Sequence, residues 1–419
     1  MLDMQRRLTN GFYALLSLPS TAMGFALSIQ IAALSWILST QYGLDIHEIG
    51  IVWAAGPLAG ILGQVAIGML SDKVWFWGGR RRPFNLIGGV LAALMLIALP
   101  NIHRISAALG FEGILGVAIA VALTLDLAIN ISFNPTRSII ADVTPEGNPR
   151  TKGYTWMQTI SGFFGVAAYA VGATLGNYTL IYGGAVIVLL FSLIPPLFIV
   201  EPRDMQDAAA NENDAADERE AAVRETRWGQ LWRIYIAHAF SWLGIQTMFV
   251  YIIAYINQKL QPASDFESGQ IISISFLILN TVGFILPVLV LEPLAERFGR
   301  VRVHLTAVAV MAAAYLGIVL FGTSSIALYV LMAFAGVGWA AVVSLPFAIM
   351  SENVEKGRMG FFMGIFNLSV VIPQLIVSLG LGILIQSATD KNIIFIIAAV
   401  SLAVSAGLWL LVREPQAKE

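Results

Sequence analysis

Asp126 and Arg137 are ionisable residues within one long apolar stretch of the sequence. At about 100° per residue, the eleven positions from 126 to 137 make three helical turns and about 20°. Both side chains would therefore project from one helix face, about 16 Å apart along the axis. Asn130 and Phe133 fall on the same stripe, and Pro135 frees a backbone carbonyl within it. Ionisable groups at the depth of a bilayer are costly and usually functional, so this stripe is the first candidate site.

The two charged side chains suit different tasks in moving a polar solute. Low-dielectric surroundings disfavour a charged carboxyl group, so Asp126 is suited to bind and release a proton near neutral pH. Arg137 carries five donors and keeps its charge, which suits contact with solute hydroxyl groups or with carboxylates. We therefore expect proton coupling at Asp126 and solute contacts from Asp126, Asn130 and Arg137. The alternative is that both charges pair with other helices and only hold the bundle together.

Polar and aromatic side chains in other apolar stretches are further candidates for solute binding. An aromatic ring matches the apolar C–H face of a sugar, and amides and hydroxyls can bond to sugar hydroxyls. These candidates are Ser28, Gln30, Gln246, Tyr251, Trp339, Asn367 and Gln374. For each of them the alternative is helix packing or a hydrogen bond between helices. The roles of His47 and His238 stay open, because a lone histidine is more often a hydrogen-bonded helix contact than a proton relay.

The composition excludes several classes of protein. Of 419 residues, 58% are hydrophobic and only 12% are charged, about half the share of about 25% in soluble domains. A soluble enzyme is therefore excluded, and a net charge of −2 provides no basic field for nucleic acid. The chain has no cysteine, and its four histidines lack metal-ligand spacing. We expect no enzyme activity, no metal and no cofactor, with the proton as the coupling ion.

Long apolar runs separated by short charged segments indicate an all-α polytopic membrane protein. A membrane-crossing helix needs about 20 mostly apolar residues, and twelve such runs are present. The predicted spans are 12–40, 47–71, 83–103, 112–140, 150–176, 179–200, 229–259, 267–295, 302–322, 324–350, 357–387 and 391–412. The runs are too long and continuous for the strands of an outer-membrane barrel.

The positions of Lys and Arg predict the orientation. With a cytoplasmic N-terminus, all but four of the 24 Lys and Arg residues face the cytoplasm. The exceptions are Arg104, Lys259 and Lys391 on the outer side and Arg137 within a span. Residues 1–11 with the first run read as an uncleaved first span. We expect a multi-pass protein of the inner or plasma membrane with both termini in the cytoplasm.

An acidic polar stretch at 201–228 divides the chain into two six-helix halves, 1–200 and 229–419. The stretch itself reads as a solvated cytoplasmic linker, with a regulatory docking site as the alternative.

The two halves share a motif in their inner loops. The short loops after the second and the eighth span each carry an acid, then a base, then Gly-Arg. We interpret these loops as a conformational latch made of acid–arginine pairs. Its predicted members are Asp72, Arg80, Arg81, Asp142, Glu296 and Arg300. The alternative is that the basic residues only keep these loops on the cytoplasmic side of the membrane.

Two halves with paired inner-loop motifs resemble the major facilitator superfamily, whose halves rock around a midplane site. Within that superfamily the fourth span, with Leu-Asp-Leu-Ala around Asp126, resembles the sucrose–proton symporters of plants and their animal relatives. Other stretches agree in order, namely Trp53–Pro57, Gly79–Phe84, Leu345–Ala348, Gly364–Gln374, and His47 before span two. The similarity covers most of the chain and is most specific in spans one, two, four, ten and eleven.

The resemblance implies proton-coupled uptake of a glucoside such as sucrose or maltose by alternating access. It also implies that Asp126 handles the proton and contributes to sugar binding, and that Arg137 is essential. The family's span seven ends in an acidic and basic cluster, whereas residues 250–258 carry none, so the sugar itself stays open. We expect the protein to be a monomer. Its expected partners are a small sugar, protons and the lipid bilayer, and we expect no nucleic acid. The alternatives are an uncoupled facilitator or exporter of another small solute, and a membrane receptor that transports nothing.

Overall fold

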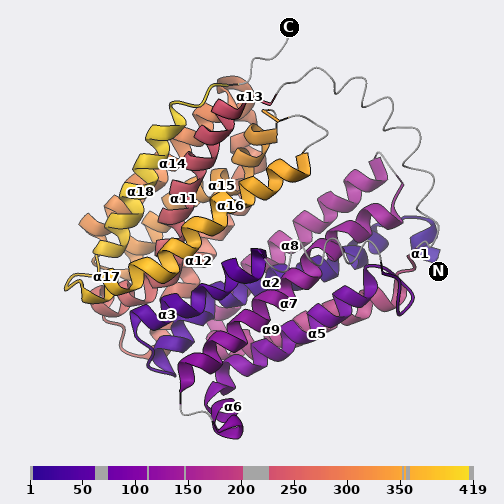
Figure 1. The fold of residues 1–419 in the computed structure, drawn as a ribbon, viewed down its shortest axis with the longest axis horizontal. Coiled ribbons are helices and arrows are strands. Elements are labelled where there is room, and N and C mark those ends of the chain that lie inside the picture. The colour runs from indigo at the N-terminus through magenta and orange to yellow at the C-terminus, as the bar shows by residue number, and fades with distance from the viewer. Residues whose placement is uncertain are drawn as a thin grey trace. The chain divides into compact units, whose positions relative to one another are not determined.

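The structure, a computed structural model, describes residues 3–61, 74–110, 113–145, 148–201, 226–351, 353–354 and 359–414. Apart from one isolated bridge between Phe76 and Gly79, these residues form helices, turns and loops (Figure 1). The chain divides into two compact units. Unit 1 comprises Met1–Met205 with Ser264–Ser273, and unit 2 comprises Gln206–Ala263 with Ile274–Glu419.

Unit 1 is a bundle of long helices with short connections. Its helices are α1 (Asp3–Arg6), α2 (Asn10–Thr40), α3 (Ile46–Trp53), α5 (Arg82–Ala98), η1 (Leu99–Asn101), α6 (Ile102–Leu109), α7 (Ile114–Val143), α8 (Asn148–Leu175) and α9 (Asn177–Phe198). Local sequence sets several helix ends. Thr9 caps α2 by accepting from the backbone N–H of Phe12, and Asp45 and Glu48 form a reciprocal capping box at the start of α3.

Unit 2 is a second helical bundle. Its elements are α11 (Trp228–Tyr255), η2 (Ile256–Leu260), η3 (Pro287–Leu291), α13 (Glu292–Phe298), α14 (Arg300–Phe321), α15 (Ser325–Ser351), α16 (Met359–Ile376), η5 (Val377–Leu381), α17 (Gly382–Ser387) and α18 (Ile393–Trp409). The segments η2, η3 and η5 are π-helical turns that continue α-helices. Such π-turns are rare, and two of them interrupt predicted spans eight and eleven.

Helix α12 (Asp265–Leu286) contributes to both units. Its first residues are bonded within unit 1, where the Trp36 indole donates to the Asp265 carbonyl at 2.7 Å and Gln270 donates to the Ala173 carbonyl at 2.9 Å. If the chain were divided only at residues 201–228, residues 264–273 would belong to the second half. Contacts distant in sequence therefore decide its place.

The predicted membrane-spanning helices are present. Among the described residues nine helices are long and apolar enough to cross a membrane, and two shorter apolar helices are Ile46–Ile61 and Ile393–Trp409. Together with α8, which is long but more polar, these helices correspond one to one to the predicted spans. Residues 62–71 of the second span, 112 of the fourth and 357–358 of the eleventh lie outside the described residues. The twelve-helix fold class is confirmed.

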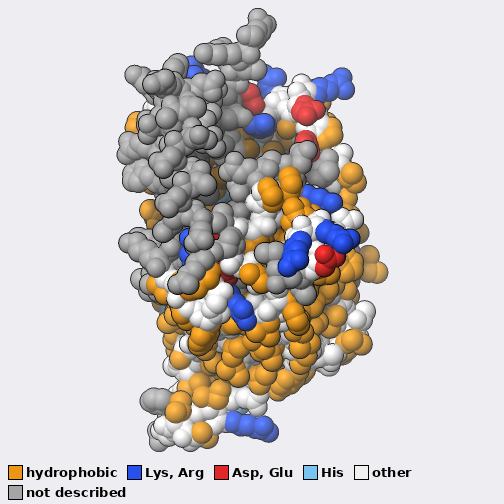
Figure 2. Space-filling view, turned by 90° about the vertical axis from the view of Figure 1, so that its right-hand side faces the viewer, with side chains coloured by type: hydrophobic (Ala, Val, Ile, Leu, Met, Phe, Trp, Pro, Cys, Tyr) orange, Lys and Arg blue, Asp and Glu red, His pale blue; other side chains and the backbone are white. Residues whose placement is uncertain are grey.

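The surface composition fits burial in lipid. On the face in Figure 2, hydrophobic side chains gather in a broad band, and charged side chains lie above and below it. Large apolar side chains such as Ile326 and Leu289 are 74% and 69% exposed. A water-soluble monomer rarely exposes such extended apolar surface.

Candidate functional site

Asp126 lies on α7 and is 5% exposed. The Gln30 side chain on α2 donates from Nε2 to Asp126 Oδ2 at 2.9 Å. Gly56 lies against the same carboxyl group, so that a Cβ added there would sit 3.4 Å from Oδ2. Within the described part of the chain, Asp126 forms no ion pair. The acid is therefore enclosed by three chain segments and holds one amide hydrogen bond.

The predicted neighbours of Asp126 on α7 occupy different surroundings. Asn130 donates from Nδ2 to the backbone carbonyl of Asp126 at 2.8 Å and is half-buried. Arg137 is exposed, and its guanidinium lies 4.2 Å from the centroid of the Phe133 ring. Asp126 and Arg137 thus lie on one helix without pairing, and the cation–π contact leaves the donors of Arg137 available.

Helix α2 brings a second polar side chain into unit 1. Ser28 is 8% exposed, donates to the Gly24 carbonyl at 3.1 Å, and shares a hydrogen bond with the hydroxyl of Tyr169 on α8. Tyr169 is itself buried and did not enter the sequence-based set. Its only signal in the sequence is a tyrosine in the middle of an apolar run, which is not distinctive.

Unit 2 gathers several of the predicted solute-binding residues. Gln374 on α16 donates to Gln246 on α11 at 3.3 Å, and the Trp339 indole on α15 donates to Asn280 on α12 at 3.2 Å. The Trp339 ring also lies 5.4 Å from the ring of Phe249. Asn280 and Phe249 were not predicted, although an asparagine inside an apolar run is a usable signal.

Two further predicted binding residues of unit 2 lie apart from these contacts. The Tyr251 side chain is 1% exposed, and its hydroxyl donates to the Val377 carbonyl at 3.0 Å. That bond ties α11 to the π-turn η5 inside the bundle. Asn367 is half-buried on α16.

Two of the residues predicted for the latch, Arg81 and Asp142, form an ion pair. Arg81 Nε lies 3.0 Å from Asp142 Oδ2, and the two side chains are 10% and 14% exposed. Arg80 is close in sequence, but its Nε has no hydrogen-bond partner among the described residues. Asp72 lies outside the described residues. Glu296 is exposed on α13.

Glu201, three residues after the end of α9, binds the backbone at the start of α5. Its carboxylate accepts hydrogen bonds from the backbone N–H groups of Arg80, Arg81 and Arg82 at 2.7, 2.9 and 2.7 Å. Gly79 leaves room for the carboxylate, because a Cβ there would collide with Glu201. A carboxylate at a helix N-terminus satisfies unpaired donors and complements the helix dipole.

The same arrangement recurs in unit 2. Glu414 accepts from the backbone N–H groups of Arg300 and Val301 at 2.6 and 2.9 Å at the start of α14. Gly299 precedes them with φ +92°, and a Cβ there would lie 2.9 Å from the Glu414 carboxyl carbon. Sequence reasoning recognised the loops but missed both glutamates. The signal was present, since each glutamate directly precedes a proline after the last span of its half.

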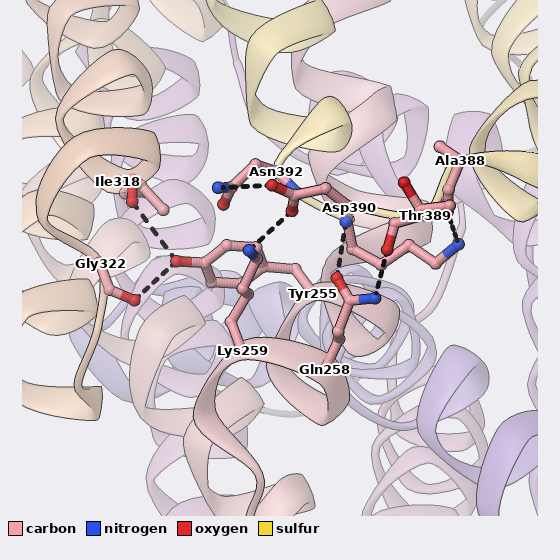
Figure 3. A network of polar contacts seen from close by, with 10 residues as sticks. Tyr255, Gln258, Lys259, Ile318, Gly322, Ala388, Thr389, Asp390 and Asn392 are labelled. Atoms are coloured by element: carbon pink, nitrogen blue, oxygen red, sulfur yellow. Dashed lines mark hydrogen bonds and ion pairs between the residues drawn. The ribbon is translucent and has the colours of Figure 1, made fainter.

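A second polar network joins helix ends of unit 2 (Figure 3). Gln258 in η2 donates to the Thr389 carbonyl at 2.9 Å and accepts from the Lys391 N–H at 2.7 Å. Lys259 Nζ lies 2.7 Å from Asp390 Oδ1. The Lys259 ammonium, by its hydrogen bond, holds the pKa of Asp390 below its usual value, and the N–H of residue 392 acts in the same direction. The network ties the end of α11 to the loop before α18.

Among the described residues, no three His, Asp or Glu side chains gather as possible ligands. The polar groups that bond to Asp126 are the amides of Gln30 and Asn130, which suit a neutral hydrogen-bonding solute.

Comparison with known proteins identifies the family. Residues 16–290 and 234–419 match the sequence pattern of the Major Facilitator Superfamily. The chain is 25% identical to the sucrose transport protein SUC4 of Arabidopsis thaliana over 88% of its own length and 83% of that protein. It is 26% identical to the sucrose transport protein SUT2 of Oryza sativa subsp. indica, with coverage of 88% and 86%.

Solved structures show the same fold. The nucleoside transporter NupG superposes with a TM-score of 0.72 at 13% identity, covering 96% of this chain and 99% of that one. The xylose transporter XylE from E. coli, in an inward open conformation, superposes with a TM-score of 0.70 at 12% identity, covering 97% of both chains. With two helical bundles, an acid buried in a membrane span and a match along most of its length, the chain belongs to the Major Facilitator Superfamily and is a membrane transporter rather than an enzyme.

Proposed function

We propose that the chain is a proton-coupled sugar symporter that takes up a glucoside of the sucrose or maltose type by alternating access. The observation that carries this proposal is Asp126, an acid buried in a membrane span and bonded only to the amide of Gln30 among the described side chains. The sugar class is supported by the relatives named sucrose transport proteins in Arabidopsis and rice.

In the proposed cycle, the charge state of Asp126 controls movement of the sugar. A buried carboxylate without a cationic partner is costly, so a proton from outside neutralises Asp126 before the loaded protein changes conformation. The neutral acid can both donate to and accept from sugar hydroxyls, and Asn130 and Arg137 add amide and guanidinium donors. Release of the proton inside weakens these contacts and lets the sugar leave.

The remaining expectations belong to the same proposal. The protein acts as a monomer in the inner or plasma membrane, in contact with lipid and with both termini in the cytoplasm. Sugar and protons are its only partners in the cycle, and no metal, cofactor or nucleic acid takes part.

The test is sugar uptake into proteoliposomes that hold purified protein, with an imposed proton gradient. We expect wild type to accumulate labelled sucrose or maltose above equilibrium and to acidify the lumen as it does so. Asp126→Asn removes the titratable group at nearly unchanged size, and it should abolish accumulation and sugar-induced proton movement. Asp3→Asn, at a side chain 72% exposed, is the matched control and should behave as wild type.

Three outcomes would reject the proposal in different ways. Accumulation by Asp126→Asn would remove this residue from proton coupling. Equilibration that survives an uncoupler and never exceeds equilibrium would indicate a facilitator, or an exporter if the flow is outward. Sugar binding without any movement would indicate a receptor.

A further inference from the structure

Arg104 is an exposed basic residue at the start of α6, at the end of α5 away from Arg80–Arg82. We propose that Arg104 and Tyr182 bind the phosphate of an anionic glycerophospholipid, whose acyl chains lie along α5 and α9 toward the middle of the membrane. In the predicted orientation this lipid belongs to the outer leaflet. The inference concerns lipid binding and does not depend on the transported solute. We define the lipid strip as Leu94, Ile97, Asn101, Arg104, Tyr182 and Val186.

The other two bases on the predicted outer side are held by partners in unit 2. Lys259 Nζ lies 2.7 Å from Asp390 Oδ1, and the Lys391 ammonium donates to three backbone carbonyls. Arg104, by contrast, makes no ion pair within the described part of the chain. Its side-chain hydrogen bond there, from Nη1 to Asn101 Oδ1, is long at 3.4 Å. Most of the five guanidinium donors are therefore available to a ligand.

Asn101 brings the side chains of Arg104 and Tyr182 to one place. Its Nδ2 donates to the Ile97 carbonyl at 2.8 Å and to the Tyr182 hydroxyl at 3.3 Å, and its Oδ1 accepts from Arg104. Both side chains contact one amide group, so a single phosphate can reach both. Because the Tyr182 oxygen accepts in this bond, its O–H is left to donate. Hydrogen bonds from such donors to a charged phosphate are among the strong ones.

An exposed apolar surface runs from this polar end toward the middle of the membrane. It is formed by Leu94 and Ile97 on α5 and by Val186 on α9, which are between 43% and 55% exposed. Positions 94, 97, 101 and 104 recur at intervals of three, four and three residues, which places them on one helix face. The rise from 94 to 104 is about 15 Å, half of the hydrocarbon thickness of about 30 Å. The strip therefore matches one leaflet in length.

Helices α5 and α9 lie side by side along the strip (Figure 1). Near Gly89 and Ser192 their backbones approach closely, because a Cβ on the glycine would lie 2.0 Å from the serine Cβ. The second contact, from Asn101 to Tyr182, is late along the chain from α5 and early in α9. The two helices are therefore antiparallel, and both present their polar end on the same side of the membrane.

The charge of the polar end decides the kind of lipid. The strip holds one cation and no acid, so it attracts a phosphodiester and provides no partner for the ammonium of a zwitterionic headgroup. The alternative is that Arg104 only anchors α6 at the membrane surface, as basic residues near the ends of spans do. Such an anchor would favour anionic lipid no more than any other exposed arginine does.

Native mass spectrometry of the purified full-length protein in detergent measures the bound lipid directly. Dioleoyl phosphatidylglycerol and dioleoyl phosphatidylcholine are added separately at matched concentrations. We expect wild type to bind phosphatidylglycerol preferentially. Arg104→Gln should weaken that binding about fivefold or more, the effect of losing a hydrogen bond to a charged group. Arg302→Gln, at an exposed arginine of α14 outside the strip, is the matched control and should bind as wild type does.

Two further variants separate the headgroup from the acyl chains. Tyr182→Phe keeps the ring and removes the O–H, so it should weaken binding of phosphatidylglycerol and leave phosphatidylcholine unchanged. Val186→Asn places a polar group against the chains and should weaken both lipids. Glycerol phosphate, which lacks acyl chains, should not displace the lipid at equal concentration. Displacement would indicate a site for free phosphate and would overturn the lipid assignment.

Thermal unfolding gives a second readout. A ligand that binds only the folded state raises the Tm as its concentration rises, so phosphatidylglycerol should raise the Tm of wild type more than that of Arg104→Gln. Without added lipid the two proteins should unfold at the same temperature, because Arg104 is exposed. The inference is overturned if wild type does not prefer phosphatidylglycerol, if Arg104→Gln binds it as wild type does, or if Arg302→Gln loses as much binding as Arg104→Gln.

Discussion

At the scale of the residue, Asp126 combines burial with very few partners. Among the residues that the structure places, Gln30 supplies the one side-chain hydrogen bond to Asp126, and Gly56 leaves space beside the carboxyl group. A hydrogen bond from a neutral amide stabilises the carboxylate without the strength of an ion pair. An acid held this way can change its protonation state, whereas an acid locked to an arginine could not do so as easily.

Gln30→Leu tests this arrangement. It removes the only side-chain donor to Asp126 among the described residues, and a hydrogen bond to a charged group is worth about 1.5–3 kcal/mol. We expect net sugar uptake, which needs the ionised state of Asp126, to slow by about tenfold or more. Exchange of labelled for unlabelled sugar needs no deprotonation and should change much less. Equal slowing of both fluxes would contradict this role for Gln30.

Asp390 supports a pH prediction outside the membrane spans. The hydrogen bond from Lys259 lowers the pKa of Asp390 from its ordinary value of 3.8. Because the folded-state pKa is the lower one, the pair stabilises the fold above about pH 4, and that contribution is lost as the pH falls through the folded-state pKa. The Asp390 side chain is 56% exposed, so the contribution stays within about 1 kcal/mol.

The measurement is thermal unfolding of detergent-solubilised protein. Asp390→Asn should lower the Tm slightly at pH 7, and the difference from wild type should shrink as the pH falls below about 4. A difference that grows on acidification would contradict the sign of the prediction.

At the scale of the element, each bundle is closed by a glutamate in the segment after a helix, Glu201 after α9 and Glu414 after α18. The N-termini of α5 and α14 have no side-chain cap of their own, and Glu201 and Glu414 provide the acceptors instead. Glycine is required before each helix, because the carboxylate approaches the backbone closely there. The repeated inner-loop motif therefore serves as a receptor for a carboxylate as well as a source of positive charge.

Glu414→Ala should destabilise unit 2 by about 1–2 kcal/mol, the usual effect of removing a helix cap. Gly299→Ala should cost at least as much, because it introduces both a collision and a strained φ of +92°. Thermal unfolding is the measurement. Glu296→Ala, at an exposed acid of the same loop, is the matched control and should stay within about 0.5 kcal/mol. A larger effect at Glu296 than at Glu414 would reverse the assignment.

At the scale of the whole molecule, the ion pair of Arg81 and Asp142 joins the loop after the second span to the end of α7. Removing one partner of a largely buried pair leaves an unpaired charge, at a cost of about 3–5 kcal/mol. We propose that the pair biases the conformational equilibrium of the transporter, because the states of such a protein differ by only a few kcal/mol.

The bias can be measured because the natural chain has no cysteine. A single Ser138→Cys on α7 reports access to this region by its rate of thiol labelling. Asp142→Asn should raise the labelling rate several-fold, and Arg81→Gln combined with Asp142→Asn should return it toward wild type, because no unpaired charge remains. Ser138→Cys combined with Asp3→Asn is the control for loss of an acidic charge at the surface. An unchanged rate in Asp142→Asn would remove this pair from the conformational change.

The sequence was a reliable guide to the helices. Runs of apolar residues long enough to span a bilayer have few alternatives to helix, because backbone groups in lipid must be satisfied within one segment. For that reason most predicted spans agree with the helices to within a few residues, although α12 ends at Leu286 where the eighth span was predicted to reach residue 295. The stripe of α7 with Asp126 was identifiable from spacing alone. The π-turns at 256–260, 287–291 and 377–381 carry no comparable signal in the sequence.

Only the tertiary structure decided which side chains meet. Glu201 and Arg80 are 121 positions apart, Glu414 and Arg300 are 114 apart, and Gln30 and Asp126 are 96 apart. Hydropathy and spacing act within one helix, whereas these contacts depend on how several helices pack. The sequence by itself thus determined the number, length and polarity of the helices, because the bilayer dictates these locally. The partners of Asp126, the glutamate caps and the place of residues 264–273 in unit 1 were decided by packing.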